Sequence, residues 1–357
     1  MILPSRFNAP RGGKLRDLPQ STSHSRTGVR RLLRALRHGA CLLLLAPVLT
    51  AAAEPLWLSD TPPAREWAKK ARHAHGGPVE RGRRGVYVKR LWLRSGDTPR
   101  DAEYPKGAAG EHLLRGPEGQ ALEAKPFRAE TGRGLVFAMP DEGFYNAFHI
   151  QRQVKDGTLV VDVAKAEALK HSCGAGHDRK FTLSRMPPRT TDGVPFEILR
   201  ERLPGEDFHS HLTSGDRLVF RVLHRGEPAA GATVELVSQN GWRKRTTTGA
   251  DGEAAFRMVA DYHPHWSAFD KDHRQRFLVT ADYRTGTDGD LQGTPYRTVR
   301  YRTSYAGAYF PAEEGYMSYV YGFGAFLIAL LATGAGVYHY RLRQRRPARR
   351  EAFDETA

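Results

Sequence analysis

The sequence predicts a mainly β protein with two β-sandwich domains and one C-terminal transmembrane helix. Three observations lead to this fold class. Short stretches of alternating apolar and polar residues recur between Gly, Pro and Asp turns, whereas amphipathic helical patterns are scarce. One long apolar stretch without charged residues lies close to the C-terminus.

Residues 1–53 are predicted to be a secretory signal peptide. Nine Lys or Arg residues and a single acid, Asp17, precede the run "ACLLLLAPVLTAAAEP", which ends in Ala51–Ala53. A basic region, a short apolar core and a small-residue site occur in that order in signal peptides. We therefore expect cleavage after Ala53, which would also remove Cys41.

The β segments follow. Residues 54–190 are predicted to form a first β domain, with an irregular charged segment at 62–85, and residues 191–303 a second. The alternating strands read "GVYVKRLWLR", "GTLVVDVA", "DRLVFRVL", "ATVELVS", "EAAFRM" and "RFLVTADY". A helical turn or two is predicted in "VAKAEALKH", and residues 304–315 are predicted to be an extended linker.

Tyr316–Tyr340 contains no Asp, Glu, Lys or Arg and is long enough for one transmembrane helix. Tyrosines lie at both of its ends, as in an aromatic belt, and six arginines follow in the tail 341–357. The positive-inside rule then predicts a single-pass protein of the inner membrane, with a cytoplasmic tail and the bulk of the chain in the periplasm.

The formal net charge of +16 is concentrated at the two ends of the chain. Between them, acidic and basic residues are mixed without a basic run. Nucleic-acid binding proteins usually carry a concentrated basic stripe, so the sequence indicates no nucleic-acid partner.

The most specific motif lies in the second domain, where G-x-P-x-x-G-A-x-V (226–234) is followed by T-x-G-x-D-G-x-A-x-F (247–256). It resembles the carboxypeptidase-regulatory-like, transthyretin-like β-sandwich module. With "VPFEILRERLPGEDFHSHLTSGD" before it and "EPLWL" at the start of the first domain, the chain resembles a bacterial exported family of unknown function. Its members are labelled "nickel uptake substrate-specific transmembrane region". The resemblance implies two immunoglobulin/transthyretin-like domains and a link to metal uptake.

Histidines are clustered in pairs with one residue between them. The pairs are His73/His75, His209/His211 and His263/His265. Residues i and i+2 of a strand point to the same side, so one pair can reach one ion. Imidazole suits nickel, copper, zinc and iron. The expected ion is nickel, copper, cobalt or zinc. We expect His209, His211, His263 and His265 to be metal ligands. His73 and His75 are instead predicted to lie in a solvated loop.

"KHSCGAGHD" holds Cys173 between His171 and His177. These three side chains are predicted to form a second or joint metal site, and a thiolate would favour copper(I) or zinc. Two alternatives remain for Cys173: an intermolecular disulfide and an inert buried thiol. A disulfide within the chain is excluded if Cys41 is removed.

Together these features predict a membrane-anchored periplasmic protein that is not an enzyme and that presents a transition-metal ion to an uptake system. No Gly-x-Ser-x-Gly or His-Glu-x-x-His motif is present. The expected partners are the membrane, through Tyr316–Tyr340, and a transporter or envelope protein, because one helix cannot form a transport path. The alternative is an envelope adaptor whose β-sandwiches dock a protein without metal.

Overall fold

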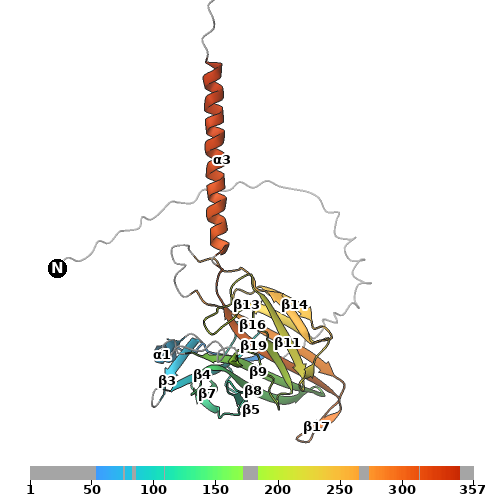
Figure 1. Ribbon diagram of the computed structural model, residues 1–357. Coiled ribbons are helices and arrows are strands. Elements are labelled where there is room, and N and C mark those ends of the chain that lie inside the picture. Colours follow the sequence, from blue (N-terminus) through green and yellow to red (C-terminus); the bar gives the residue numbers. More distant parts are fainter. Residues whose placement is uncertain are drawn as a thin grey trace, which may run out of the picture. The chain divides into compact units, whose positions relative to one another are not determined.

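The computed structural model describes residues 54–74, 77–82, 86–107, 109–171, 184–264, 273–312 and 314–345. Strands make up about half of this part of the chain, and a long apolar helix follows them (Figure 1). The predicted mainly β class with a C-terminal apolar helix is therefore confirmed. The predicted signal peptide and most of the predicted cytoplasmic tail lie outside the described residues.

Four sheets contain the described strands. The first sheet has the order β2 (Arg72–Ala74), β3 (Gly77–Arg81), β4 (Tyr87–Ser95), β7 (Gly132–Met139) and β6 (Lys125–Ala129), with β1 (Leu56–Ser59) also paired to β4. The short helix α1 (Arg65–Lys70) lies between β1 and β2 in the chain.

The second sheet has seven strands, in the order β14 (Arg243–Thr247), β13 (Thr233–Ser238), β16 (Gln275–Thr285), β19 (Thr298–Tyr309), β9 (Thr158–Lys170), β8 (Gly143–Lys155) and β5 (Glu111–Arg115). The third contains β10 (Phe196–Arg200), β11 (Arg217–His224), β12 (Glu227–Pro228) and β15 (Glu253–Arg257). A small ribbon pairs β17 (Gly289–Leu291) with β18 (Thr294–Tyr296).

The seven-stranded sheet is a middle layer, because its strands β8 and β9 are buried on both faces. Tyr145 and Ala147 pack into one core with the strands of the first sheet. Phe148 and Ile150 pack into a second core with the strands of the third sheet. The alternation of side chains along a strand thus places two hydrophobic cores on opposite sides of one sheet.

Both halves of the predicted two-domain division contribute to this middle sheet. β9 precedes the predicted boundary at residue 190 and β19 follows it, yet the two strands pair in parallel over 158–165 and 298–305. Arg302 lies opposite Asp162 in this register and donates to both of its carboxylate oxygens, at 2.5 and 2.6 Å. The number of domains therefore stays a prediction.

The predicted helical turn in "VAKAEALKH" is wrong, because its residues up to Lys170 belong to strand β9. Ala, Lys, Glu and Leu favour helices when nothing else decides. Here β9 pairs with β8 along its whole length and with β19 along its first part. Three alanines, Ala164, Ala166 and Ala168, fill the core under the first sheet. Pairing and burial outweigh the local propensity.

Turns of the kind indicated by the Gly, Pro and Asp residues lie within both motifs of the second predicted domain, at Gly226 and at Gly252. Gly226 and Gly252 have φ values of 88° and 75°, in the left-handed region that favours glycine. A Cβ atom on Gly252 would lie only 2.6 Å from the carbonyl oxygen of Val222. Glycine at this position therefore also allows the backbone at Val222 to lie close to the turn.

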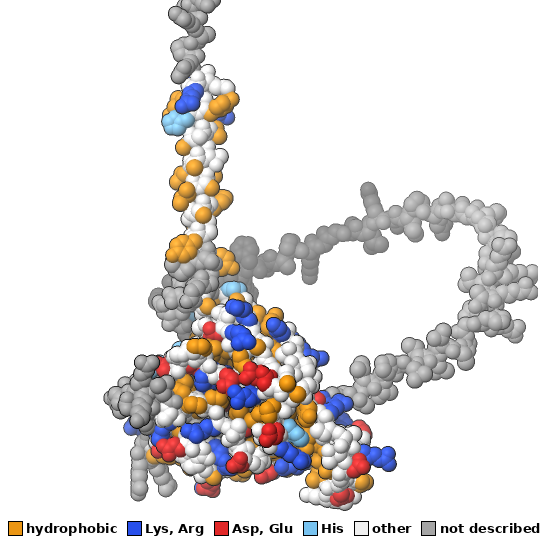
Figure 2. Space-filling view, turned by 45° about the vertical axis from the view of Figure 1, so that its right-hand side comes forward, with side chains coloured by type: hydrophobic (Ala, Val, Ile, Leu, Met, Phe, Trp, Pro, Cys, Tyr) orange, Lys and Arg blue, Asp and Glu red, His pale blue; other side chains and the backbone are white. Residues whose placement is uncertain are grey.

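The C-terminal helix α3 spans Glu314–Gln344. From Tyr319 on it is long and apolar enough to cross a membrane, and none of the residues of its most apolar window is buried. Figure 2 shows hydrophobic side chains along it, whereas acidic and basic side chains are interspersed over the strands. A buried core helix would not expose these side chains, so α3 fits a single-pass membrane anchor.

We expect Lys165→Met to lower the free energy of unfolding by about 3 kcal/mol. Lys165 Nζ lies 2.9 Å from Glu197 Oε1 between the second and third sheets, with side-chain exposures of 0% and 4%. The substitution would leave the Glu197 carboxylate buried without its cation. Urea unfolding of the full chain in detergent, followed by tryptophan fluorescence, measures the effect.

The matched control is Lys125→Met, since Lys125 is 70% exposed and lies 3.8 Å from Glu123. It should change the free energy of unfolding by less than about 0.5 kcal/mol. The double substitution Lys165→Met with Glu197→Leu should recover most of the loss. An equal cost for the two single substitutions would contradict the role given to the buried pair.

Candidate functional site: a charged pocket and a histidine pair

A pocket of about 680 Å³ lies where the first sheet meets the seven-stranded sheet. Its walls come from β1, β4, β9, β16 and β19 and from the loop at 206–212. β1 is held against the middle sheet because Ser304 Oγ on β19 donates to the carbonyl oxygen of Leu56, at 2.7 Å. The pocket therefore depends on contacts between segments almost 250 residues apart.

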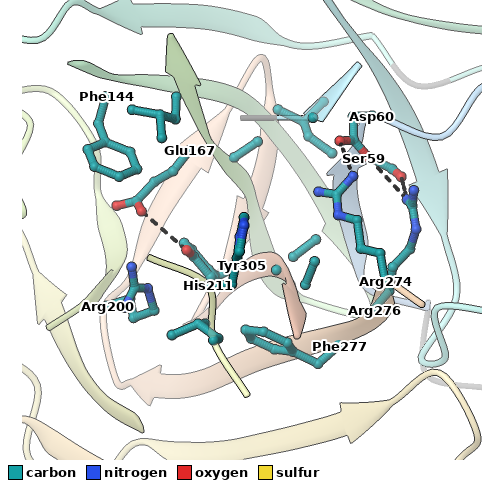
Figure 3. A pocket seen from close by; sticks show the side chains of 18 of the residues that line it. Ser59, Asp60, Phe144, Glu167, Arg200, His211, Arg274, Arg276, Phe277 and Tyr305 are labelled. Atoms are coloured by element: carbon teal, nitrogen blue, oxygen red, sulfur yellow. Dashed lines mark hydrogen bonds and ion pairs between the residues drawn. The ribbon is translucent and has the colours of Figure 1, made fainter. Parts of the chain in front are cut away.

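One side of the pocket carries three cations around a single carboxylate, and Figure 3 labels this carboxylate, Asp60, together with Arg274 and Arg276. Arg274 and Arg276 each place a terminal nitrogen 3.1 Å from an oxygen of Asp60, and Lys89 Nζ lies 3.6 Å from Asp60 Oδ2. Arg276 also donates to Ser59 Oγ, at 3.3 Å. The cluster therefore joins β1 and β4 to the start of β16.

Burial and charge act against each other in this cluster. Burial alone would raise the pKa of Asp60, but the charges of Arg274, Lys89 and Arg276 hold it well below its ordinary value. Burial lowers the pKa of Lys89 to about 8, and the two arginines add to this effect while Asp60 opposes it. The carboxylate thus stays ionised, and the ammonium group loses its proton at a lower pH than an ordinary lysine does.

The opposite side of the pocket carries paired charges. Glu167 on β9 accepts from Arg202 NH1 at 3.0 Å and from the Tyr305 hydroxyl at 3.2 Å. Arg200 donates from both terminal nitrogens to Glu206, at 2.9 and 2.5 Å. Burial, with the charge of Glu167, raises the pKa of Tyr305 to about 12, so its hydroxyl remains a neutral donor.

The structure brings two of the predicted ligands together from different motifs. His171 follows the end of β9, and His209 lies in the loop between β10 and β11. Their Nε2 atoms are 2.9 Å apart and their rings are nearly perpendicular, with centroids 4.4 Å apart. His171 is buried, and its Nδ1 atom lies 3.6 Å from Glu142 Oε2.

The loop that carries His209 is held by its own polar groups. Asp207 Oδ1 accepts from the backbone N–H of His209 and from the Ser210 hydroxyl, both at 2.9 Å. This is the local turn chemistry that aspartate favours. His211 lines the pocket and packs its ring against Phe310, with centroids 5.0 Å apart. His209 and His211, which form one H-x-H pair in the sequence, therefore have different neighbours.

Of the other predicted ligands, the structure describes His211 and His263. His263 is exposed, and no contact described in the resolved ranges joins it to His171 or His209. Cys173, His177 and His265 lie outside the described residues. Among the described residues, no group of three or more His, Cys, Asp or Glu side chains is arranged to hold a metal ion.

Sequence reasoning missed a second histidine pair. His112 on β5 lies opposite His149 on β8, and their Nδ1 atoms are 3.3 Å apart. Burial lowers the pKa of His149 to about 4, and the charges of His112 and Arg133 add to the effect. Only the strand register brings the two together, since 37 residues separate them in the chain. The Asp60 cluster was missed for the same reason.

We expect the stability of the fold to decrease as the pH falls from about 6.5 toward 4. In this range the unfolded chain binds more protons at His149 than the folded protein does, because the folded pKa is the lower one. The stability contributed by a neutral His149 is therefore present above pH 6.5 and is lost below it, by up to about 3 kcal/mol. Unfolding in urea at several pH values measures this slope.

His149→Gln should make the profile flatter in this range. His263→Gln, at an exposed histidine, should leave the wild-type slope. An unchanged slope in His149→Gln would contradict the assignment.

No protein-family model matches the chain, and no curated protein matches it. Among solved structures, the BSP domain of a biofilm-associated protein is 14% identical, covers 63% of this chain and 27% of its own, and has a TM-score of 0.16. A Ca²⁺-stabilized adhesin with which an Antarctic bacterium binds ice is 13% identical, with coverages of 73% and 49% and a TM-score of 0.18. The chain thus spans about half or less of each, and at these TM-scores neither likeness carries an argument.

Proposed function

We propose that this chain is a membrane-anchored protein that binds a transition-metal ion through His171 and His209 and presents it to an uptake system. The observation that carries the proposal is the 2.9 Å separation of their Nε2 atoms. Two metal–nitrogen bonds of about 2.0–2.1 Å at an ordinary coordination angle place their nitrogens roughly 3 Å apart. The pair needs little rearrangement to hold one ion.

The surroundings of the pair support the same use. A histidine that binds a metal usually turns its other ring nitrogen toward a carboxylate or carbonyl, which orients the ring. Glu142 lies on that side of His171, with 3.6 Å between Oε2 and Nδ1. Asp207 fixes the backbone that carries His209. A carboxylate thus faces the second ring nitrogen of His171, and the backbone at His209 is fixed.

Two ligands do not complete a transition-metal site, which usually takes four or more. We propose that Cys173 and His177, which follow His171 closely in the chain, or His211 supply the rest. A set with the Cys173 thiolate would favour copper(I) or zinc, and an imidazole set would suit nickel, cobalt or copper. His263 and His265 would form a separate site.

The proposed location is the periplasmic face of the inner membrane, with α3 as anchor and the arginine-rich tail inside. A single helix provides no path for an ion, so uptake requires a transporter as partner. The resemblance to the exported family with the nickel-uptake label remains part of this proposal.

We expect metal-free full-length protein in detergent to bind a transition-metal ion at the His171/His209 pair, measured by calorimetry with Ni²⁺, Co²⁺, Cu²⁺ and Zn²⁺ separately. His209→Ala should weaken the affinity at least about tenfold, because it removes one of the two positioned imidazoles. His112→Ala is the matched control, since it breaks the other close histidine pair. It should leave the affinity unchanged.

If the chain is instead an adaptor that docks a protein without metal, none of these ions should bind at the His171/His209 pair. If none of the four ions binds, or if His112→Ala weakens binding as much as His209→Ala, the metal proposal at this pair fails. A partner protein that is captured equally well by the His209→Ala variant and by wild type, in the presence of a chelator, would then favour the adaptor.

A further inference from the structure

The Asp60 cluster carries more positive than negative charge. Lys89, Arg274 and Arg276 all form ion pairs with Asp60. Within the described parts of the chain, the ion pairs of Arg274 and Arg276 go to this carboxylate alone. One negative charge therefore faces three positive ones at the wall of a pocket, where the low dielectric strengthens every interaction.

The two arginines remain accessible from the pocket. Their side chains are 31% and 24% exposed, whereas Asp60 is 12% and Lys89 only 2% exposed. Each arginine uses one terminal nitrogen for Asp60. A guanidinium group has five N–H donors in a planar fork, so both retain donors that an incoming oxyanion can use.

Apolar side chains line the pocket beside these cations. Phe277 on β16 lines it as a fully buried side chain (Figure 3), whereas Tyr87 on β4 and Leu169 on β9 line it with part of their surface exposed. Gly307 on β19 makes room for Phe277, because a Cβ atom there would lie 2.3 Å from the phenyl ring. The volume of about 680 Å³ falls in the range of small-molecule sites. The pocket thus combines a cationic end with apolar walls.

We propose that this pocket binds a small organic carboxylate. Its carboxylate group pairs with Arg274 and Arg276 next to Lys89, and its apolar body packs against the partly exposed side chains of Tyr87 and Leu169. Inorganic phosphate or sulfate would meet the same cations, but would leave the apolar walls without a partner. The paired charges around Glu167 and Arg200 add a neutral polar boundary on the opposite side.

Binding of a carboxylate in this pocket should change the protonation of Lys89, and calorimetry can detect that change. Burial and the two arginines lower its pKa to about 8. A bound carboxylate adds a nearby negative charge and raises this pKa, so the complex takes up protons at pH 8–9. The heat of binding should then depend on the ionisation enthalpy of the buffer.

The test uses full-length protein in detergent, freed of metal on a chelating resin, so that its outcome is independent of the proposed histidine site. Thermal unfolding and calorimetry are measured with benzoate, succinate and inorganic phosphate at equal ionic strength. We expect benzoate or succinate to bind and to raise the unfolding temperature more than phosphate does. If neither carboxylate binds, or if phosphate protects equally well, the proposal is overturned.

Two substitutions on β16 form a matched pair. Arg276→Gln should weaken carboxylate binding at least about tenfold, because it removes a charge-assisted hydrogen-bond donor. Arg284→Gln, at a side chain that is 71% exposed, should leave it unchanged. Equal affinities in the two variants would exclude the arginine as an anion ligand. Arg274→Gln gives the same comparison if Arg276→Gln does not fold.

Asp60→Asn separates binding from a purely structural role. It removes the internal carboxylate that competes for the three cations, so the variant should bind benzoate or succinate more tightly than wild type. A cluster that serves only to hold β1 and β4 together would show no such gain. Weaker or unchanged carboxylate binding in Asp60→Asn would contradict the proposal.

Discussion

Strand β9 is buried on both faces, and the rest of the β structure depends on that constraint. It pairs antiparallel with β8 and parallel with β19, so it joins the N-terminal and C-terminal strands in one sheet. One face packs under the first sheet and the other against the third. A strand in this position has no solvent face on which to place charged side chains.

The charged residues of β9 are consequently all paired. Asp162 is held by Arg302 in the register of the parallel pair, and Lys165 reaches Glu197 across the second core. Glu167 accepts from Arg202 and Tyr305. Such pairs add little net stability over apolar residues, but removing one partner is costly, so they favour this register over its alternatives.

The two proposed sites follow from the same arrangement. His171 is placed at the end of β9, where the loop after β10 brings His209 to it. β1 lies over β19 and carries the Asp60 side chain to Arg274 and Arg276 at the start of β16. His171 and His211 line the same pocket as the arginines. An ion and an organic anion would therefore bind close to each other.

Local patterns were enough to predict the β class, the Gly, Pro and Asp turns between strands and the apolar C-terminal helix. Each of these depends on residues that are near one another in the chain: alternation, positive φ and a long apolar run. The helical turn expected in "VAKAEALKH" failed because a central strand obtains its stability from its neighbours and not from its own composition.

The sequence by itself also indicated histidine clusters, because ligand residues at short spacing are visible in one dimension. Which histidines meet was decided only by the tertiary structure: His209 meets His171 and not its neighbour His211, and His112 meets His149. The charged pocket had no sequence signal at all, since Asp60 and Arg274 are 214 residues apart. Strand pairing and the packing of β1 on β19 bring these charges together, and neither is encoded in any short stretch.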